Sequence, residues 1–140
     1  MSKFFAHDIE MEFPMETGAF AVRFQENLTH PEAMHFKMAA GFLDHPGDAY
    51  ILTGPQDDTH HGGIRTMKLD HKSLHLSLSQ AAAQTLQTGP EIEIEFFPLG
   101  EHEFTTLERG LQRILSISAT PFQVHQAGYQ GPVIWQIDQD

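Results

Sequence analysis

The sequence predicts an α+β fold in which a mainly antiparallel sheet of about six strands carries two or three helices packed on one face. Several short segments alternate apolar and polar residues, which is typical of half-buried strands. The segment 101–116 instead repeats apolar residues at helical spacing. With 140 residues, 40% of them hydrophobic and eleven of them Phe, the chain can fill one core, so we expect a single domain over 1–140.

The N-terminal part is expected to contain two strands and a helix. Residues 4–13 alternate loosely and predict one half-exposed strand, and residues 19–24 predict a second. Thr29 and Glu32 have the spacing of a capping box, in which the two side chains satisfy backbone N–H groups reciprocally. A short helix over 33–40 should follow.

Two alternating segments, 64–69 and 74–78, predict a hairpin around a turn that begins at Asp70. In the first segment, one side of the strand is expected to carry Arg65, Met67 and Leu69. In the second, the inward side is expected to carry Leu74, Leu76 and Leu78.

Residues 50–52 predict a short strand before this hairpin, and the polar stretch 54–61 predicts a loop. Gly62 and Gly63 follow the loop, without the lysine and the spaced glycines of a phosphate-binding loop. We therefore expect this pair to permit an unusual backbone conformation at a strand start or a bulge.

Ser79 predicts the N-cap of a helix over 80–87, and the helix 101–116 is strongly amphipathic. Between the two helices, the segment 91–96 alternates strictly. Its inward face should carry Ile92, Ile94 and Phe96, and its outward face Glu91, Glu93 and Glu95.

The tail, residues 117–140, is rich in small and polar residues until a strand-like segment at 133–137. That final strand either joins the sheet or pairs with a second copy of the chain, so a homodimer stays open as an alternative.

The chain is acidic, with nineteen Asp and Glu against eight Lys and Arg and a formal charge of −11. Nucleic acids and anionic membranes are therefore not expected as partners, because binding them requires basic side chains. A basic protein would be attracted, although an acidic surface also serves solubility alone. Cysteine is absent, and no signal peptide or run of about 18 apolar residues is evident, so a cytoplasmic location is expected.

The ten histidines raise the question of a metal site. Asp57, Asp58, His60 and His61 are close in sequence, but adjacent side chains diverge on an extended chain. No native metal site is therefore expected, with His60 and His61 as weak candidates only. A Gly-x-Ser-x-Gly elbow is also missing, and a thiol nucleophile is impossible, so neither enzymatic activity nor a cofactor is predicted.

The glutamate row has two interpretations that the sequence does not separate. The carboxylates can imitate nucleic-acid phosphates and attract a basic partner. They can equally protect an exposed strand edge from aggregation. The large side chains expected to be exposed, and so to anchor a partner, are Tyr50, Phe97, Tyr129 and Trp135.

The sequence of the central segment resembles that of one protein family. The residues that carry the resemblance are Tyr50-Ile51-Leu52, His61-Gly62-Gly63-Ile64, Met67-Lys68-Leu69, Leu74 to Leu78, Ala83, Leu86, Ile94-Glu95-Phe96, Phe104 to Leu107, Gly110-Leu111 and Ile114-Leu115. In this order they resemble the Imm10 family of immunity proteins from bacterial polymorphic toxin systems, most clearly over 48–116. The resemblance implies an α+β protein that binds a cognate toxin, such as a basic nuclease, without chemistry of its own.

The expected function is therefore neutralisation of a toxin by protein–protein interaction. Candidate partner-binding residues are Asp57, Asp58, His60, His61, Glu91, Glu93, Glu95 and Trp135. The alternative is a stand-alone homo-oligomeric α+β module that binds a small ligand or a metal.

Overall fold

The residues that the computed structural model describes are 2–12, 20–26, 34–40, 50–116, 122–125, 129 and 131–137. They form eleven strands in two sheets, together with two helices. The α+β class is confirmed, whereas the expected single sheet of about six strands is wrong.

Sheet A has the strand order β1-β9-β8-β7-β11-β10. Its strands are β1 (Ser2–Ala6), β9 (Glu91–Phe96), β8 (Ser73–Leu78), β7 (Ile64–Leu69), β11 (Val133–Ile137) and β10 (Phe122–His125). β1 pairs with β9 in parallel, and the other pairs are antiparallel.

Sheet B is antiparallel, with the order β2-β3-β4-β5-β6. Its strands are β2 (Asp8–Glu12), β3 (Ala21–Gln25), β4 (His35–Ala39), β5 (Ile51–Thr53) and β6 (Thr59–His61). The helices are α1 (Gln80–Leu86) and α2 (Glu101–Ser116).

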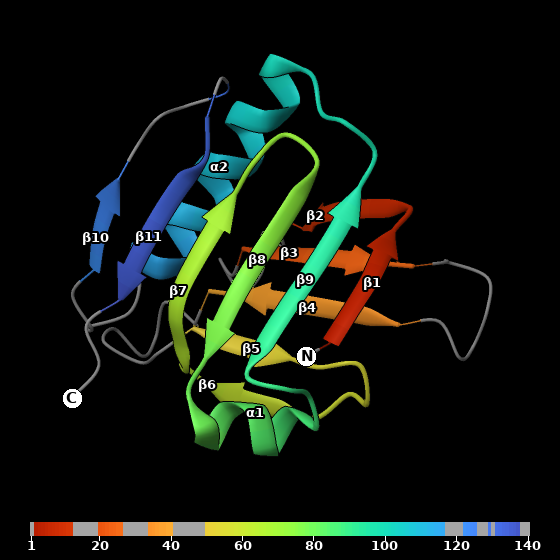
Figure 1. The fold of residues 1–140 in the computed structure, drawn as a ribbon, viewed down its shortest axis with the longest axis vertical. Helices are drawn as coiled ribbons and strands as arrows, with labels where there is room; N and C mark the ends of the chain where they lie inside the picture. The colour runs from red at the N-terminus through yellow and green to blue at the C-terminus, as the bar shows by residue number, and fades with distance from the viewer. Residues whose placement is uncertain are drawn as a thin grey trace.

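The two sheets are layered, and the strands of sheet B run across those of sheet A (Figure 1). Sheet B lies behind β8, β9 and β1, while α2 lies behind β7 and β11. α1 closes one end of the molecule beside β6, so of the two described helices it is α2 that packs on a sheet face as expected. One face of sheet A is thus covered by sheet B and α2 together.

The core lies between these layers. The inward faces predicted for β8 and β9 are confirmed, since Leu74, Leu76, Leu78, Ile92, Ile94 and Phe96 are all buried. Phe24 of sheet B stacks on Phe96 of sheet A with ring centroids 6.2 Å apart. Each such fully buried side chain contributes about 1.5–3 kcal/mol relative to exposure.

α2 has the predicted limits, and its buried stripe is formed by Phe104, Leu107, Gly110, Leu111, Ile114 and Leu115. Gly110 matters because a Cβ there would lie 2.7 Å from Cζ of Phe20. The glycine therefore lets the helix approach sheet B closely, and α2 contacts β3.

The single strand expected over 4–13 is in fact two strands on different sheets. β1 buries Phe4 and Ala6 against the core of sheet A, and the chain turns a corner at His7 to begin β2. His7 Nδ1 lies 2.7 Å from the carbonyl oxygen of Glu26, which fixes this corner. The alternation shifts by one residue at this corner. The pattern of the segment is too irregular for the sequence alone to show that shift.

The helix expected over 33–40 is wrong, because His35–Ala39 forms strand β4 between β3 and β5. Phe36, Met38 and Ala40 are buried on alternate positions, which is the period of a strand. The capping box at Thr29 and Glu32 lies outside the described residues.

The polar stretch 54–61, expected as a loop, contains strand β6, which forms a hairpin with β5. The chain then crosses to sheet A through Gly62 and Gly63, whose φ angles are +72° and +106°. Such angles are strained for any residue with a Cβ, as the sequence predicts for this pair.

Tyr50 stabilises this crossing with two hydrogen bonds, one at each end of it. Its hydroxyl accepts a hydrogen bond from the Ile64 N–H at 2.9 Å, and its carbonyl accepts one from the Gly62 N–H at 2.7 Å. On the far side, the Ser79 N–H donates to the Gly63 carbonyl at 2.8 Å, and the Ser79 hydroxyl caps α1 as predicted.

A bulge follows the crossing, because the register between β7 and β8 shifts between Ile64 and Thr66. Ile64, Met67 and Leu69 are consequently buried, while Arg65 is exposed. The expectation that Arg65 shares a side with Met67 and Leu69 is therefore wrong.

The tail completes sheet A. The strand expected at 133–137 is β11, which pairs with β7 of the same chain and also with β10, a strand that the sequence did not predict. Neither described helix is both long and apolar enough to cross a membrane.

We predict that Gly63→Ala destabilises the protein by about 1–3 kcal/mol, because the backbone there has a positive φ and the new Cβ would lie 2.5 Å from Cβ of Ala82. Urea denaturation measures the loss. The matched control is Gly100→Ala, where the nearest atom to a new Cβ is Glu103 Oε1 at 3.4 Å and the change should stay below about 1 kcal/mol. Equal effects in the two variants would contradict the role of this crossing.

Tyr50→Phe should cost about 1–3 kcal/mol, because it leaves the buried Ile64 N–H without its acceptor. Burial raises the pKa of Tyr50 from its usual 10.0 to about 12, against a smaller lowering by the hydrogen bond from Ile64. The contribution of the neutral hydroxyl is therefore complete below pH 10 and lost as the pH rises from 10 towards 12. Denaturation curves of both proteins across this range should show the stability difference shrinking, and a constant difference would contradict the assignment.

Candidate functional site

The outer face of sheet A is an open surface in the described part of the chain. Figure 1 looks onto it, and neither helix nor any strand of sheet B lies over it. Strand alternation and register place on this open face the side chains of Lys3, Phe5, Thr66, Lys68, Ser73, His75, Ser77, Glu91, Glu93, Glu95, Gln123, His125, Ile134 and Gln136.

The glutamate row lies on this face as predicted, but each carboxylate has a basic neighbour. Lys3 Nζ is 2.9 Å from Glu95 Oε1 and 3.9 Å from Glu93 Oε2. His75 Nε2 is 3.0 Å from Glu91 Oε2. The hydrogen bond to Glu95, followed by the charges of Glu93 and Glu95, raises the pKa of Lys3. The row is therefore a line of ion pairs and hydrogen bonds rather than a bare strip of negative charge.

The position of β9 also decides one interpretation of the row. β9 pairs with β1 on one side and with β8 on the other, so it is not an edge strand. Protection of an exposed edge is therefore not the reason for these glutamates.

Asp57 and Asp58 lie instead in the β5–β6 hairpin of sheet B. Asp57 adopts a left-handed conformation with φ of +66°, and its carboxylate is 2.9 Å from His35 Nε2. The Asp58 carboxylate accepts a hydrogen bond from the side-chain amide of Gln87 at the end of α1. Both carboxylates thus bind groups of their own chain, and the structure places them on a different sheet from the glutamates.

His60 and His61 diverge, as adjacent residues of a strand should. His60 is half-buried, with Nδ1 3.0 Å from the carbonyl oxygen of Gly62, whereas His61 is exposed. Among the residues that the structure describes, no three His, Asp or Glu side chains are grouped so that they could hold a metal ion.

Two of the four proposed anchors are not exposed. Trp135 is fully buried on β11, and Tyr50 is 2% exposed at the crossing, so the expectation that these two side chains are exposed is wrong. Tyr129 is half-buried, and its hydroxyl donates to the Leu99 carbonyl at 3.0 Å. Alternation alone cannot identify the buried side of β11 when the neighbouring strands are unknown.

Phe97 is the exception, because its side chain is 59% exposed and is the one large exposed hydrophobic side chain among the described residues. Its ring packs edge-on against Phe5 and His7, which sequence reasoning did not connect with it. We call Phe5, His7 and Phe97 the corner cluster, since they meet where the chain leaves sheet A for sheet B. The sequence did contain a signal for the exposure of Phe97. This residue directly follows the buried end of a strand, so the alternation of that strand points its side chain outward.

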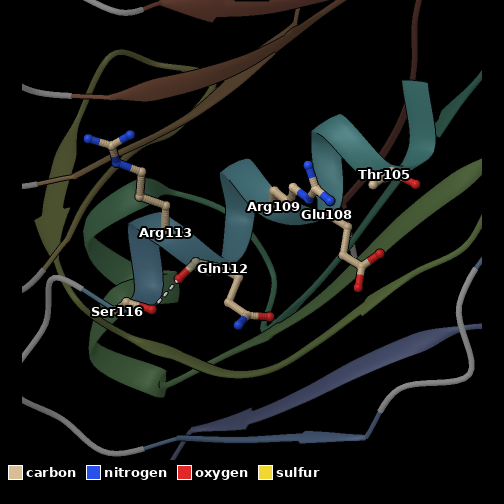
Figure 2. A pocket seen from close by; sticks show the side chains of 6 residues that line it. All are labelled: Thr105, Glu108, Arg109, Gln112, Arg113 and Ser116. Atoms are coloured by element: carbon tan, nitrogen blue, oxygen red, sulfur yellow. Dashed lines mark hydrogen bonds between the residues drawn. The ribbon is translucent and has the colours of Figure 1, made fainter. Parts of the chain in front are cut away.

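A second feature is an open hollow of about 540 Å³ along the solvent side of α2 (Figure 2). Its described lining comes from one helical stripe, formed by Thr105, Glu108, Arg109, Gln112, Arg113 and Ser116. In Figure 2, the side chain of Arg113 points away from those of Glu108 and Gln112. The stripe therefore spreads its polar groups along the helix instead of gathering them around one point.

We predict that Trp135→Ala destabilises the protein by about 3–5 kcal/mol, because it empties a fully buried indole volume. Its exposed neighbour Gln136 provides the control, and Gln136→Ala should change the free energy of unfolding by less than about 0.5 kcal/mol. Both values come from urea denaturation. A fully stable Trp135→Ala protein would show that this side chain is not a core residue.

Comparison with protein families gave a match to the central part of the chain. Residues 44–105 match the family model described as Immunity protein 10, which covers the crossing, the β7–β8 hairpin, α1, β9 and the start of α2. The comparisons with curated proteins and with solved structures found no significant match. The resemblance seen in the sequence is confirmed over residues 44–105, where this chain is similar to the Immunity protein 10 family.

Proposed function

We propose that this protein binds a cognate bacterial toxin in the cytoplasm and neutralises it by direct contact, without catalysis. The observation that carries the proposal is the Immunity protein 10 match over residues 44–105. The family implies an immunity protein, and the binding of one particular toxin is the step that we add.

The acidic character of the chain supports a basic toxin, such as a nuclease. A net charge of −11 accelerates the encounter with a positively charged protein and disfavours nucleic acids. Long-range attraction affects mainly the association rate, whereas tight binding also needs buried anchors.

The negative charge is a property of the whole chain rather than of the glutamate row. All eight Lys and Arg residues lie in the described part, where Lys3 neutralises part of the row. Several acidic residues lie outside that part, namely Glu16, Glu32, Asp44, Asp48, Asp138 and Asp140. We therefore propose that the glutamate row contributes to local recognition of the toxin. The net charge of the whole chain provides the long-range attraction to it.

Co-expression with the toxin encoded by the adjacent gene tests the proposal. We expect this protein to restore growth of cells that produce the toxin, and the purified pair to form a complex of nanomolar affinity, which requires about 12 kcal/mol of binding free energy. The association rate should fall as the salt concentration rises, because salt screens the attraction between opposite charges.

The toxin domain with its active site inactivated serves for calorimetry, so that binding is measured without toxicity. An unrelated acidic protein of similar size is the control for non-specific attraction. Absence of a toxin gene beside this one, or absence of both rescue and binding, would show that the proposed function is wrong.

A further inference from the structure

The corner cluster combines exposure with tight internal packing. Phe97 is 59% exposed, yet its ring centroid lies 4.9 Å from that of Phe5 and 5.8 Å from that of His7, at interplanar angles of 81° and 74°. Phe5 and His7 are themselves 5.0 Å apart at 67°. These edge-to-face geometries are favourable for aromatic pairs, so an exposed ring is held by two others.

The cluster is also fixed to both sheets. Phe5 belongs to β1 in sheet A, and Phe97 directly follows β9, the strand that pairs with β1. His7 is joined to the end of β3 in sheet B by its 2.7 Å contact with the Glu26 carbonyl. A partner that packs on Phe97 would lose little side-chain entropy at this site, which is what a binding anchor requires.

Two carboxylates lie beside the cluster. Glu93 and Glu95 line, together with Phe5, an open hollow of about 310 Å³ beside it. The basic residues lining the hollow or paired with its glutamates are Lys72 and Lys3.

Lys3 shows that the carboxylates at this site bind a cationic side chain. Its ammonium lies 2.9 Å from Glu95 and 3.9 Å from Glu93, although the side chain is 53% exposed. A guanidinium or ammonium group of a partner can approach the same carboxylates while its aliphatic stem lies on an aromatic ring, because basic side chains stack favourably on such rings.

We infer, on the basis of the proposed function, that the corner cluster is the anchor at which the toxin docks. The toxin contributes an arginine or lysine whose stem packs on Phe97 and whose charged end pairs with Glu95. The partner is thus a basic protein, not a nucleic acid or a second copy of this chain.

Calorimetry with the inactivated domain of the toxin encoded by the adjacent gene tests this inference. Phe97→Ala should weaken binding by about 30-fold or more, because it removes the ring of an interface anchor. Glu95→Gln should slow association and make the association rate less dependent on salt. Gln123→Ala on β10, exposed at the opposite edge of the same sheet, is the control and should leave the dissociation constant within about twofold.

Phe97 is exposed, so its truncation should not unfold the protein, and thermal unfolding of each variant verifies this. If the wild type binds the toxin and Phe97→Ala binds it equally well, the inference is wrong while the proposed function stands. If the wild type itself does not bind, the proposed function fails first. Sedimentation analysis adds a third outcome, because a wild-type dimer that Phe97→Ala converts to a monomer would assign the cluster to contact between copies and overturn the inference.

Discussion

The hydrogen-bonded crossing at Gly62 and Gly63 is the constraint on which the two-sheet architecture depends. Here the chain must leave the last strand of sheet B and enter sheet A within two residues, which requires two positive φ angles in succession. Tyr50 holds both sides of this passage, accepting hydrogen bonds from Gly62 and Ile64. The buried hydroxyl is therefore a structural group, although an aromatic side chain before a polar loop resembles a binding anchor in the sequence.

Much of the fold from the β7–β8 hairpin to α2 could be predicted because its signals are local. A turn that begins at Asp70, a cap at Ser79 and the periods of β9 and α2 each lie within a few residues. β4 could not be predicted in this way, because methionine and alanine suit a helix and only pairing with β3 and β5 makes the segment a strand. The division of β1 from β2 likewise depends on long-range pairing, which the alternation of one segment does not contain.

The surface was harder to predict than the fold, for a physical reason. The outward direction of Glu91, Glu93 and Glu95 follows from the period of a strand, and the structure confirms it. Their pairing with Lys3 and His75 depends on which strands flank β9, which no single segment specifies. Trp135 illustrates the same limit, because its burial depends on which face of β11 the layer behind sheet A covers.

The parallel pairing of β1 with β9 has a consequence for how the molecule forms. Residues 2–6 pair in sheet A only with residues 92–96, so about ninety residues separate the two paired strands in the sequence. The first strand therefore has no partner in sheet A until the second has formed. Closing so large a loop is slow compared with forming a hairpin. The corner of the molecule that carries Phe5 and Phe97 therefore comes into existence late in folding, and a protein that recognises it can distinguish the finished chain from a nascent one.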